Sequence, residues 1–506
     1  MQIASRLPWS VSSSGALVQA HVRGQLPEAL RAPGLSSLPA LAARTPMAPD
    51  LVRALAADGE GAAALQALAA PGALAVATGQ QPGCVGGAVF VVLKAATAVA
   101  LARRSARALG RPVVPVFWNA ADDVDFDEVS RVGWLTAAGE LFFLELPAAG
   151  RQAQGFVGDL PAAGDEAAAS AALSLLDGAR RDALQPLLPR GARDHADWVG
   201  RLLRAVFPEL VVVDARHPAL RTHAAPLFRR YLEAADAATE AIETRAAALA
   251  AAGFAPTLSP SSTRQALFLV DGGRRLKVRD DRAPLRQALE RAPESVAANV
   301  VLRPLIQDAL FPVLASVVGP AEIGYLHESR ALRPLLGVPE SALVPRLALT
   351  LVGTNTWEAA QRHGIDAERL LAHGEAALRE AARRRAREPR QRVEAAFGAT
   401  LGALGALVPS GNTALERPLR RLEGVRDDFI AALEDAAVQE LLRAEPALER
   451  LSQRLRPRGR AQERVLATLW FLARRGIEAR QELLQLADMH LDTLEQGEVV
   501  HWLVLD

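Results

Sequence analysis

Apolar positions divide the chain into short continuous runs and longer helical stretches from residue 73 onward. The runs "GALAVATG" at 72–79 and "RPVVPVFWNA" at 111–120 predict two buried strands, and residues 88–109 between them predict a helix. A strand, a glycine-rich turn, a helix and a strand make one βαβ unit. This pattern predicts an α/β protein with a parallel sheet and right-handed crossovers.

The same alternation continues through the middle of the chain. The segments 207–216 and 345–352 predict further buried strands, and 309–337 predicts a strand that passes through a Gly-Pro turn into a helix. A long helix is expected over about 218–252, because Gly253 is the usual type of residue for a left-handed C-cap.

Two hairpins and one insertion interrupt this alternation. Apolar positions at 132–146 predict a hairpin around Ala138 and Gly139, and 265–280 predicts a second hairpin with a Gly-rich turn. Residues 150–195 are rich in Ala, Gly and Asp, and we expect an irregular or helical insertion there.

The chain changes character after about residue 355. Residues 375–400 and 413–455 have helical periodicity, and "VPSGN" at 408–412 separates them. Two long helices joined by a tight turn predict an antiparallel hairpin, for which a coiled coil is one plausible form. We expect it to serve packing or dimer formation. The tail at 499–506 predicts a terminal strand that returns to the main body.

Composition narrows the class of protein. The 506 residues are 50% hydrophobic, which is enough for a large core. A single cysteine, Cys84, excludes an internal disulfide framework and a Cys-rich zinc site, and it fits a reducing compartment. The net charge of +1 gives no electrostatic case for binding nucleic acid or an anionic membrane. The most apolar segment, 88–102, is too short to span a membrane, so we expect a cytoplasmic protein.

Lysine is almost absent from this chain. Of the 58 basic residues, all but Lys94 and Lys277 are arginine. Because ammonium and guanidinium differ in size, hydration and ability to shift pKa, a retained lysine can mark a position that arginine cannot fill. Chance survival, or a lysine whose stem packs on the surface, explains Lys94 equally well.

The loop "TGQQPGCVGG" at 78–87 lies where α/β proteins bind ligands. Amide groups at a helix N-terminus favour an anion, and glycines allow it to approach closely. The spacing matches neither of the common nucleotide-binding motifs, so a structural tight turn is about as well supported. The side chains of Gln80 and Gln81 favour a polar ligand. We expect Cys84 to be packed, because no nearby His or acid would activate it.

Carboxylates and other polar groups follow two other predicted strands. The segment "NAADDVDFDEV" at 119–129 contains Asp122, Asp123, Asp125, Asp127 and Glu128. We favour a functional role for the first two, which lie nearest the strand end, and the alternative is an acidic cap on the following helix. The segment "VVGPAEIGYLHE" at 317–328 carries Glu322, Tyr325 and His327. Arg303 precedes it and could contact an anion or pair with Asp308.

These motifs together resemble a known family. The segments "TGQQPGCVGGAVFVVLK", "PVFWNAADDVDFDEV", "LVVVDARHPALRTHAAPLF", "NVVLRPLIQDALFPVLASVVGPAEIGYL", "VPRLALTLV" and "AQERVLATLWFLARRG" follow, in order, the blocks of the bacillithiol synthase family. Its members are the proposed cysteine ligases of bacillithiol biosynthesis. The resemblance spans nearly the whole chain, and its first, second and fourth blocks are specific.

The resemblance implies a Rossmann-like core with connecting insertions, a C-terminal antiparallel helical coiled coil and a homodimer. The implied reaction joins the carboxyl group of cysteine to the amine of glucosaminyl-malate. We divide the chain into a helical N-terminal segment 1–72, a core 73–354 with insertions at about 140–205 and 253–300, a coiled-coil hairpin 355–460 and a returning segment 461–506.

The resemblance also implies site residues. The catalytic candidates are Lys94, Asp122, Asp123 and Asp125. The candidates for binding substrate or nucleotide are Gly79, Gln80, Gln81, Gly86, Gly87, Trp118, Asn119, Arg303, Glu322 and Tyr325. No metal site is expected.

One departure from the family matters for chemistry. The acidic block of the family typically reads Glu-Asp-His-Asp, whereas Val124 stands here at the histidine position. Valine cannot transfer a proton, so that role is lost or supplied elsewhere, with His327 as one candidate. Cys84 and Val85 replace the usual Leu and Phe, which suggests a reshaped pocket floor.

Formation of an amide requires an activated carboxylate. We expect the Gly-rich turn and Lys94 to hold phosphate groups, and the aspartates to orient the sugar ammonium or to act as general base. The cofactor is unknown, with ATP or ADP as candidates. Two alternatives stay open: a non-catalytic nucleotide- or metabolite-binding homologue, and a related ligase that uses another amine.

Overall fold

The computed structural model describes residues 2–8, 15–56, 62–136, 138–150, 155–278, 281–409, 412–448 and 451–506. The chain forms two compact units. The larger unit comprises residues 8–349 and 463–501, and the smaller unit comprises 1–7, 350–462 and 502–506. The four-segment division expected from the sequence stays a prediction.

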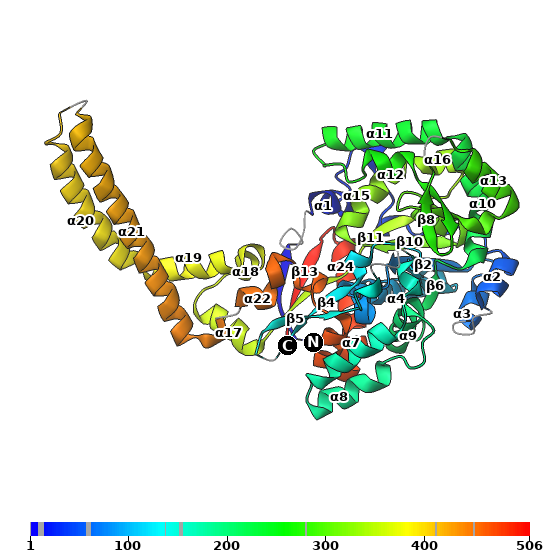
Figure 1. The fold of residues 1–506 in the computed structure, drawn as a ribbon, viewed down its shortest axis with the longest axis horizontal. Coiled ribbons are helices and arrows are strands. Elements are labelled where there is room, and N and C mark those ends of the chain that lie inside the picture. Colours follow the sequence, from blue (N-terminus) through cyan, green and yellow to red (C-terminus); the bar gives the residue numbers. More distant parts are fainter. Residues whose placement is uncertain are drawn as a thin grey trace. The chain divides into compact units, whose positions relative to one another are not determined.

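A five-stranded parallel sheet forms the centre of the larger unit (Figure 1). Its strands are β11 (Ala342–Pro345), β10 (Val313–Val318), β2 (Leu74–Gln80), β3 (Val113–Asn119) and β6 (Val211–Asp214), in that order. Most of their residues are buried, as expected for a sheet that is covered on both faces. The predicted parallel sheet is confirmed.

Helix α4 (Phe90–Leu109) makes the crossover from β2 to β3. It packs against both strands and against α24 (Ala479–Glu495), so it is buried almost all round. It ends at Gly110, whose φ of +64° is the left-handed conformation that glycine adopts without strain. The predicted helix is confirmed.

The prediction of one long helix over 218–252 is wrong in one respect. The segment forms two helices, α10 (Pro218–Glu233) and α11 (Ala235–Ala251), which are separated at Ala234. Each helix buries its own apolar residues, and α10 belongs to the cluster that covers one face of the sheet. An alanine-rich sequence carries no local signal for such a break, because packing decides it.

Smaller sheets and the insertion complete the larger unit. The two predicted hairpins are confirmed as β4 (Arg131–Leu135) with β5 (Leu141–Glu145), and β7 (Leu267–Asp271) with β8 (Arg274–Lys277). Strand β9 (Val296–Ala298) extends the second hairpin. Within 155–206 the chain is mainly helical, with α7 (Ala163–Ser174), α8 (Gly178–Leu184) and α9 (His195–Val206).

Shorter helices surround this framework. They are α1 (Ala16–Val22), α2 (Pro49–Ala56), α3 (Ala62–Ala67), α5 (Phe126–Val129), α12 (Pro260–Arg264), α13 (Ala283–Arg291), α14 (Arg303–Leu310), α15 (Pro320–Ser329), α16 (Leu332–Leu336) and α23 (Thr468–Arg475).

The smaller unit contains a three-stranded sheet in the order β1 (Ile3–Pro8), β13 (Val500–Leu505), β12 (Ala348–Val352). Strand β1 corrects the expectation that residues 1–72 are only helical. The expected C-terminal strand is present as β13, and its partners are the two strands named here.

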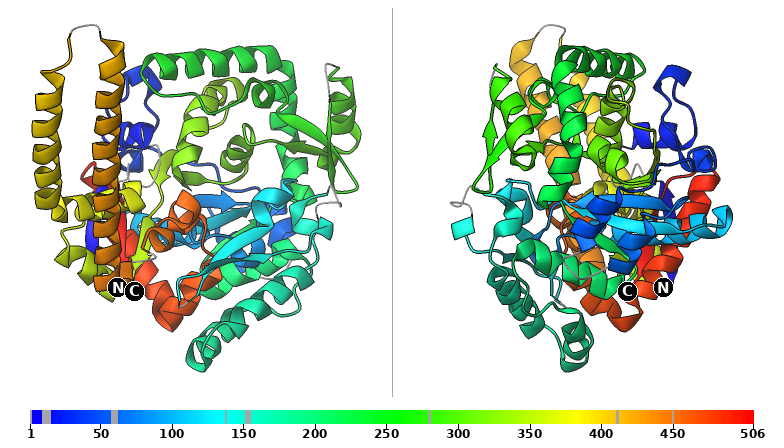
Figure 2. Two further views of the ribbon diagram at one scale, coloured as in Figure 1. Left: turned by 60° about the vertical axis from the view of Figure 1, so that its left-hand side comes forward. Right: turned by 90° about the vertical axis from the view of Figure 1, so that its right-hand side faces the viewer.

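The rest of the smaller unit is helical. Helices α17 (Thr354–Arg362), α18 (Ala367–His373), α19 (Glu375–Arg385) and α22 (Leu451–Leu455) are short. Helices α20 (Arg387–Gly405) and α21 (Thr413–Ala444) lie side by side as the expected hairpin (Figures 1 and 2). Supercoiling of this pair stays a prediction. In the described part of the chain, no helix has both the length and the apolar character that crossing a membrane requires.

Three of the buried histidines have pKa values that burial lowers strongly. His327, His490 and His501 are each at most 1% exposed. Burial lowers the pKa of His327 to about 3, with His21 adding to the effect, and it lowers the pKa values of His490 and His501 to about 4. These imidazoles are therefore neutral in the folded protein near neutral pH.

We expect the free energy of unfolding to fall as pH decreases from 6.5 to about 4. The unfolded chain binds protons at these histidines in that range and the folded chain does not, which costs roughly 1.4 kcal/mol per pH unit for each histidine. Urea unfolding of the wild type and of His490→Gln at several pH values measures the effect. A variant with an unchanged pH slope would contradict the assignment for His490.

Candidate functional site

The Gly-rich loop follows β2 and is buried over residues 84–87. Gly86 and Gly87 have φ values of +87° and +73°, which L side chains rarely adopt. Val85 also has a positive φ, +46°, an uncommon conformation for a β-branched residue. The loop is therefore a tight, buried turn whose glycines are required by its backbone.

The amide groups of this loop donate hydrogen bonds within the protein. The N-H groups of Gly86 and Gly87 bond to carbonyl oxygens of residues 83 and 84 at 3.0 and 2.9 Å, and that of Val89 bonds to Leu466 at 2.8 Å. These three amides are already engaged in the structure, and the expected binding of an anion by this loop stays a prediction. The returning segment that contains Leu466 covers the start of α4.

A buried histidine and aspartate hold the loop in place. His195 is the first residue of α9. Its Nδ1 lies 2.5 Å from Oδ2 of Asp165 on α7, and its Nε2 lies 2.9 Å from the carbonyl oxygen of Pro82. The other oxygen of Asp165 accepts the N-H of Val85 at 2.9 Å. Both side chains are fully buried. Burial alone would lower the pKa of His195, but Asp165 raises it above its ordinary value.

Sequence reasoning missed this pair. The two residues lie 30 positions apart in or beside a segment expected to be an insertion. No spacing marks them, because only the packing of α7 and α9 against the loop brings them together.

Lys94 lies buried between the ends of β2 and β10. Its Nζ is 2.6 Å from Oε2 of Glu322, 2.8 Å from the carbonyl oxygen of Gly79 and 3.1 Å from Oε1 of Gln80. The side chain is 1% exposed, which excludes the surface explanation. Burial lowers the pKa of Lys94, and Glu322 opposes that effect. Tyr325 approaches the same carboxylate, with its hydroxyl 3.5 Å from Oε1.

Asp122 and Asp123 follow β3 and pair with arginines from distant segments. Oδ2 of Asp122 accepts from Arg275 of β8 at 2.9 Å, and Oδ2 of Asp123 lies 3.6 Å from Arg303 at the start of α14. Burial alone would raise the pKa of Asp123, but Arg303 and Arg275 lower it below its ordinary value. Arg303 does not pair with Asp308, which binds Arg333 at 2.6 Å.

The remaining acids of this block have different roles. Oδ1 of Asp125 accepts the N-H of Glu128 at 3.1 Å and caps α5, as the capping alternative proposed. Gln81 donates to Asp123 at 3.3 Å and to Glu128 at 3.1 Å. Burial raises the pKa of Glu128, and Asp125 and Asp123 add to that effect.

The remaining candidate residues at the ends of β2 and β3 are Gly79, Trp118 and Asn119, and they also make structural contacts. A Cβ on Gly79 would lie 2.6 Å from the carbonyl oxygen of Trp118, so only glycine fits there. The ring of Trp118 packs edge-on against Phe311 at 6.2 Å. Asn119 is buried and donates to the carbonyl oxygen of Ala196 at 3.0 Å, which ties β3 to α9.

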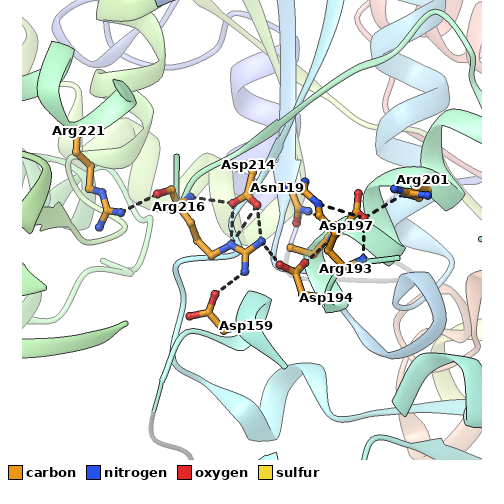
Figure 3. A network of polar contacts seen from close by, with 10 residues as sticks. Asn119, Asp159, Arg193, Asp194, Asp197, Arg201, Asp214, Arg216 and Arg221 are labelled. Carbon is orange, nitrogen blue, oxygen red and sulfur yellow. Dashed lines mark hydrogen bonds and ion pairs between the residues drawn. The ribbon is translucent and has the colours of Figure 1, made fainter. Parts of the chain in front are cut away.

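Arg216 joins three segments just beyond β6 (Figure 3). It pairs with Asp214 at 2.6 Å, with Asp194 at 2.9 Å and with Asp159 at 2.5 Å. Asp194 is the N-cap of α9, so this arginine fixes the residue that precedes His195. The sequence predicted the strand over 207–216 but none of these ion pairs.

Two further residues complete the comparison with the sequence. Cys84 is buried, and burial raises its pKa well above the ordinary value, so the expectation that it is packed is confirmed. His327 packs against His21 with ring centroids 5.2 Å apart. The structure does not support it as a substitute for the histidine missing at Val124.

The described residues contain no group of three or more His, Cys, Asp or Glu that could hold a metal ion.

Comparison with known proteins places this site in context. Residues 50–347 match the family model described as "Bacillithiol biosynthesis BshC, N-terminal Rossmann-like domain". Relatives named "Putative cysteine ligase BshC" include those of Solibacter usitatus, 31% identical with 85% of each chain covered, and Symbiobacterium thermophilum, 31% identical with 84% of each covered. The relative of Bacillus velezensis is 24% identical, with 82% of each chain covered.

We expect His195→Gln to lower the free energy of unfolding by about 1–3 kcal/mol, because it removes buried charge-assisted hydrogen bonds. Because the pKa of His195 is raised in the folded protein, its contribution to the free energy of unfolding is complete below about pH 6.5. That contribution is lost as pH rises through the folded-state pKa. The variant should therefore differ from the wild type more at pH 6 than at pH 9.

Urea unfolding at the two pH values measures this difference. His223→Gln is the matched control, since His223 pairs with an exposed aspartate, Asp50, at 3.1 Å and exposed pairs contribute less than about 1 kcal/mol. Equal losses in the two variants, or a larger loss for His195→Gln at pH 9, would refute the assignment.

Proposed function

Because the chain belongs to the bacillithiol biosynthesis BshC family, we propose that it is a cysteine ligase of bacillithiol biosynthesis. It joins the carboxyl group of cysteine to the amine of glucosaminyl-malate and forms an amide. The observation that carries this proposal is the match to relatives named as cysteine ligases over about 85% of the chain. The single cysteine fits the reducing cytosol in which such a thiol is made.

The amine must lose its proton before it can attack a carboxyl carbon. Asp123 and Glu128 flank the side chain of Gln81 and have pKa values shifted in opposite directions. Asp123 stays ionised and suits the binding of the sugar ammonium. Glu128 has the higher proton affinity and is the better general base. This division supports the proposed use of the acidic block, with Asp122 and Asp125 fixing its shape.

Activation of the cysteine carboxyl requires a good leaving group, which a phosphate supplies. Lys94 lies at the junction of β2 and β10, where the strand order reverses and open α/β sheets bind their ligands. Its ammonium is occupied by Glu322, Gly79 and Gln80. We propose that a phosphate of ATP or ADP replaces Glu322 on Lys94, which leaves Glu322 and Tyr325 to contact the ligand.

The alternative of a homologue without ligase activity, or of a ligase for another amine, has one supporting observation. Val124 is 42% exposed beside the acidic block, at the position where the family typically has histidine. Deletion of the gene in its native host separates these readings. Only the ligase of bacillithiol biosynthesis predicts loss of bacillithiol together with accumulation of glucosaminyl-malate.

We expect Asp123→Asn and Lys94→Met each to lower the rate of bacillithiol formation by about 100-fold or more. The assay supplies cysteine, glucosaminyl-malate and ATP, and mass spectrometry detects the product. Lys277→Met is the matched control, because Lys277 is exposed and is the other lysine of the chain. A wild type that forms no product would contradict the reaction. Full activity in both site variants would contradict only the residue assignments.

We also propose a homodimer that forms through a coiled coil on the hairpin of α20 and α21 and through the core. Large apolar side chains are exposed on the hairpin at Leu404, Leu407, Leu415, Val425 and Phe429. Val425 and Phe429 lie four residues apart, on one face of α21, and are each 52% exposed.

The double variant Val425→Glu/Phe429→Glu is therefore expected to be monomeric at concentrations where the wild type is a dimer. Sedimentation velocity measures the mass of each. Arg392→Glu, which changes an exposed arginine of α20, is the control. A double variant that sediments as the wild type does would place the dimer contacts elsewhere.

A further inference from the structure

A cavity of about 650 Å³ lies in the larger unit, beside the edge strand β11. Its lining comes from the end of α1, the loop 31–37, the residue after α15, β11 itself and the end of α24. This volume is within the range of about 300–1,000 Å³ that small-molecule sites have. None of the lining residues belongs to the site at the ends of β2 and β3. The cavity is therefore a separate feature of this unit.

Hydrogen bonds to β11 fix the wall of this cavity. The N-H of Leu343 donates to the carbonyl oxygen of Pro33 at 2.9 Å. The carbonyl oxygen of Leu343 accepts from Nε2 of His21, also at 2.9 Å. Burial lowers the pKa of His21, so this imidazole is neutral near neutral pH and adds no charge to the cavity. The N-terminal segment is thus bonded to the edge of the sheet, and the cavity that both of them line is preformed.

Two contacts hold Arg31 at the cavity. Its Nε donates to the carbonyl oxygen of Leu26 at 2.9 Å, and its own carbonyl oxygen accepts from Nη1 of Arg330. Both contacts leave Nη1 and Nη2 of Arg31 without a hydrogen-bond partner among the described residues. These two groups form the end of the guanidinium, where parallel N-H bonds reach two oxygens of one carboxylate or phosphate. Arg31 is exposed, so a ligand can approach it.

Two positive charges beside this cavity have no counter-charge. The charged residues of the lining are Arg23, Arg31, Arg330 and Glu495. Arg330 pairs with Glu340 at 2.8 Å, and Glu495 pairs with Arg104 at 2.6 Å. In the part of the chain that the structure describes, Arg23 and Arg31 have no ion-pair partner within 4.0 Å. The unpaired charges of these two arginines favour an anion in the cavity.

We propose that the cavity binds a small dianionic metabolite through the guanidinium groups of Arg23 and Arg31. A dianion offsets both unpaired charges, and its oxygens fit the fork of Arg31. A phosphate monoester and a dicarboxylate share this chemistry. The apolar side chains of Leu35 and Leu494 also line the cavity and suit the carbon skeleton of such a ligand. Arg330 is a positioning residue, because it holds the backbone of Arg31.

Isothermal titration of the full chain tests the proposal with two dianions, glycerol 3-phosphate and succinate, and with glycerol and acetate as their matched controls. The wild type is expected to bind at least one dianion, and to bind its matched control about 10-fold more weakly or less. Arg23→Gln and Arg31→Gln are each expected to weaken binding of that dianion by about 10-fold or more, because each removes a charged hydrogen-bonding group. Arg264→Gln, at an exposed arginine of α12, should bind as the wild type does.

Lys94→Met separates this cavity from the phosphate site proposed at the ends of β2 and β10, and it should leave binding of the dianion unchanged. Circular dichroism checks the fold of each variant. Arg23→Gln carries the test if Arg31→Gln does not fold, because Arg23 is exposed and has no ion-pair partner. Arginine-dependent binding of glycerol 3-phosphate alone identifies the ligand as a phosphate ester, and that of succinate alone identifies it as a dicarboxylate.

Two results would overturn the inference. One is a wild type that binds neither dianion. The other is full binding by both arginine variants, and if Lys94→Met then abolishes binding, the dianion occupies the proposed phosphate site instead. The titration uses no substrate of the proposed ligase reaction, so a wild type without ligase activity leaves the inference standing.

Discussion

The buried ammonium of Lys94 is the interaction on which the arrangement of the site depends. Its Nζ bonds to the carbonyl oxygen of Gly79 at the end of β2 and to the carboxylate of Glu322, in the segment after β10. It therefore links the two neighbouring strands between which the strand order of the sheet reverses. A buried charge is tolerated only when its hydrogen bonds are met. The three oxygen partners of Nζ meet this condition, and they also fix the positions of Gln80 and Tyr325. Any anion that enters this junction must compete with a carboxylate that is already in place.

Arginine organises the rest of the carboxyl edge. Five aspartates from β3, β6 and the inserted helices gather there, and Arg216, Arg275 and Arg303 offset most of their charge. The planar fork of arginine suits this work because it binds carboxylates from several segments at once. The abundance of arginine in the sequence thus has a structural use at this edge.

The Gly-rich loop shows how a local pattern and a tertiary structure can lead to different conclusions. Its glycines suggest an anion site, yet the amides of residues 85–87 and 89 bond to Asp165, to nearby carbonyls and to the returning segment. His195 and Asp165 hold the loop through buried hydrogen bonds to its backbone, which fixes its conformation. The ligand contacts that we propose come instead from side chains such as Gln81 and Asp123, which bond to each other.

The sequence by itself determined the regular parts of this protein. Periodicity and turn residues predicted the parallel sheet, helix α4, two hairpins and the helical pair near the C-terminus, because these depend on local propensity and on burial of one face. The same reasoning singled out Asp122 and Asp123, which follow a predicted strand, and composition singled out Lys94, one of two lysines in the chain. It missed β1, whose partner β13 is at the other end of the chain, and it missed the break at Ala234.

Only the tertiary structure decided which distant side chains meet. The partners of Asp122, Asp123 and Lys94 are Arg275, Arg303 and Glu322, and each lies more than 150 residues away. The buried pair of His195 and Asp165 has no sequence pattern either. Contacts of this kind follow from the packing of inserted helices and hairpins on the sheet edge. Spacing along a chain carries no information about them, since the intervening segments can take many lengths without changing the contact.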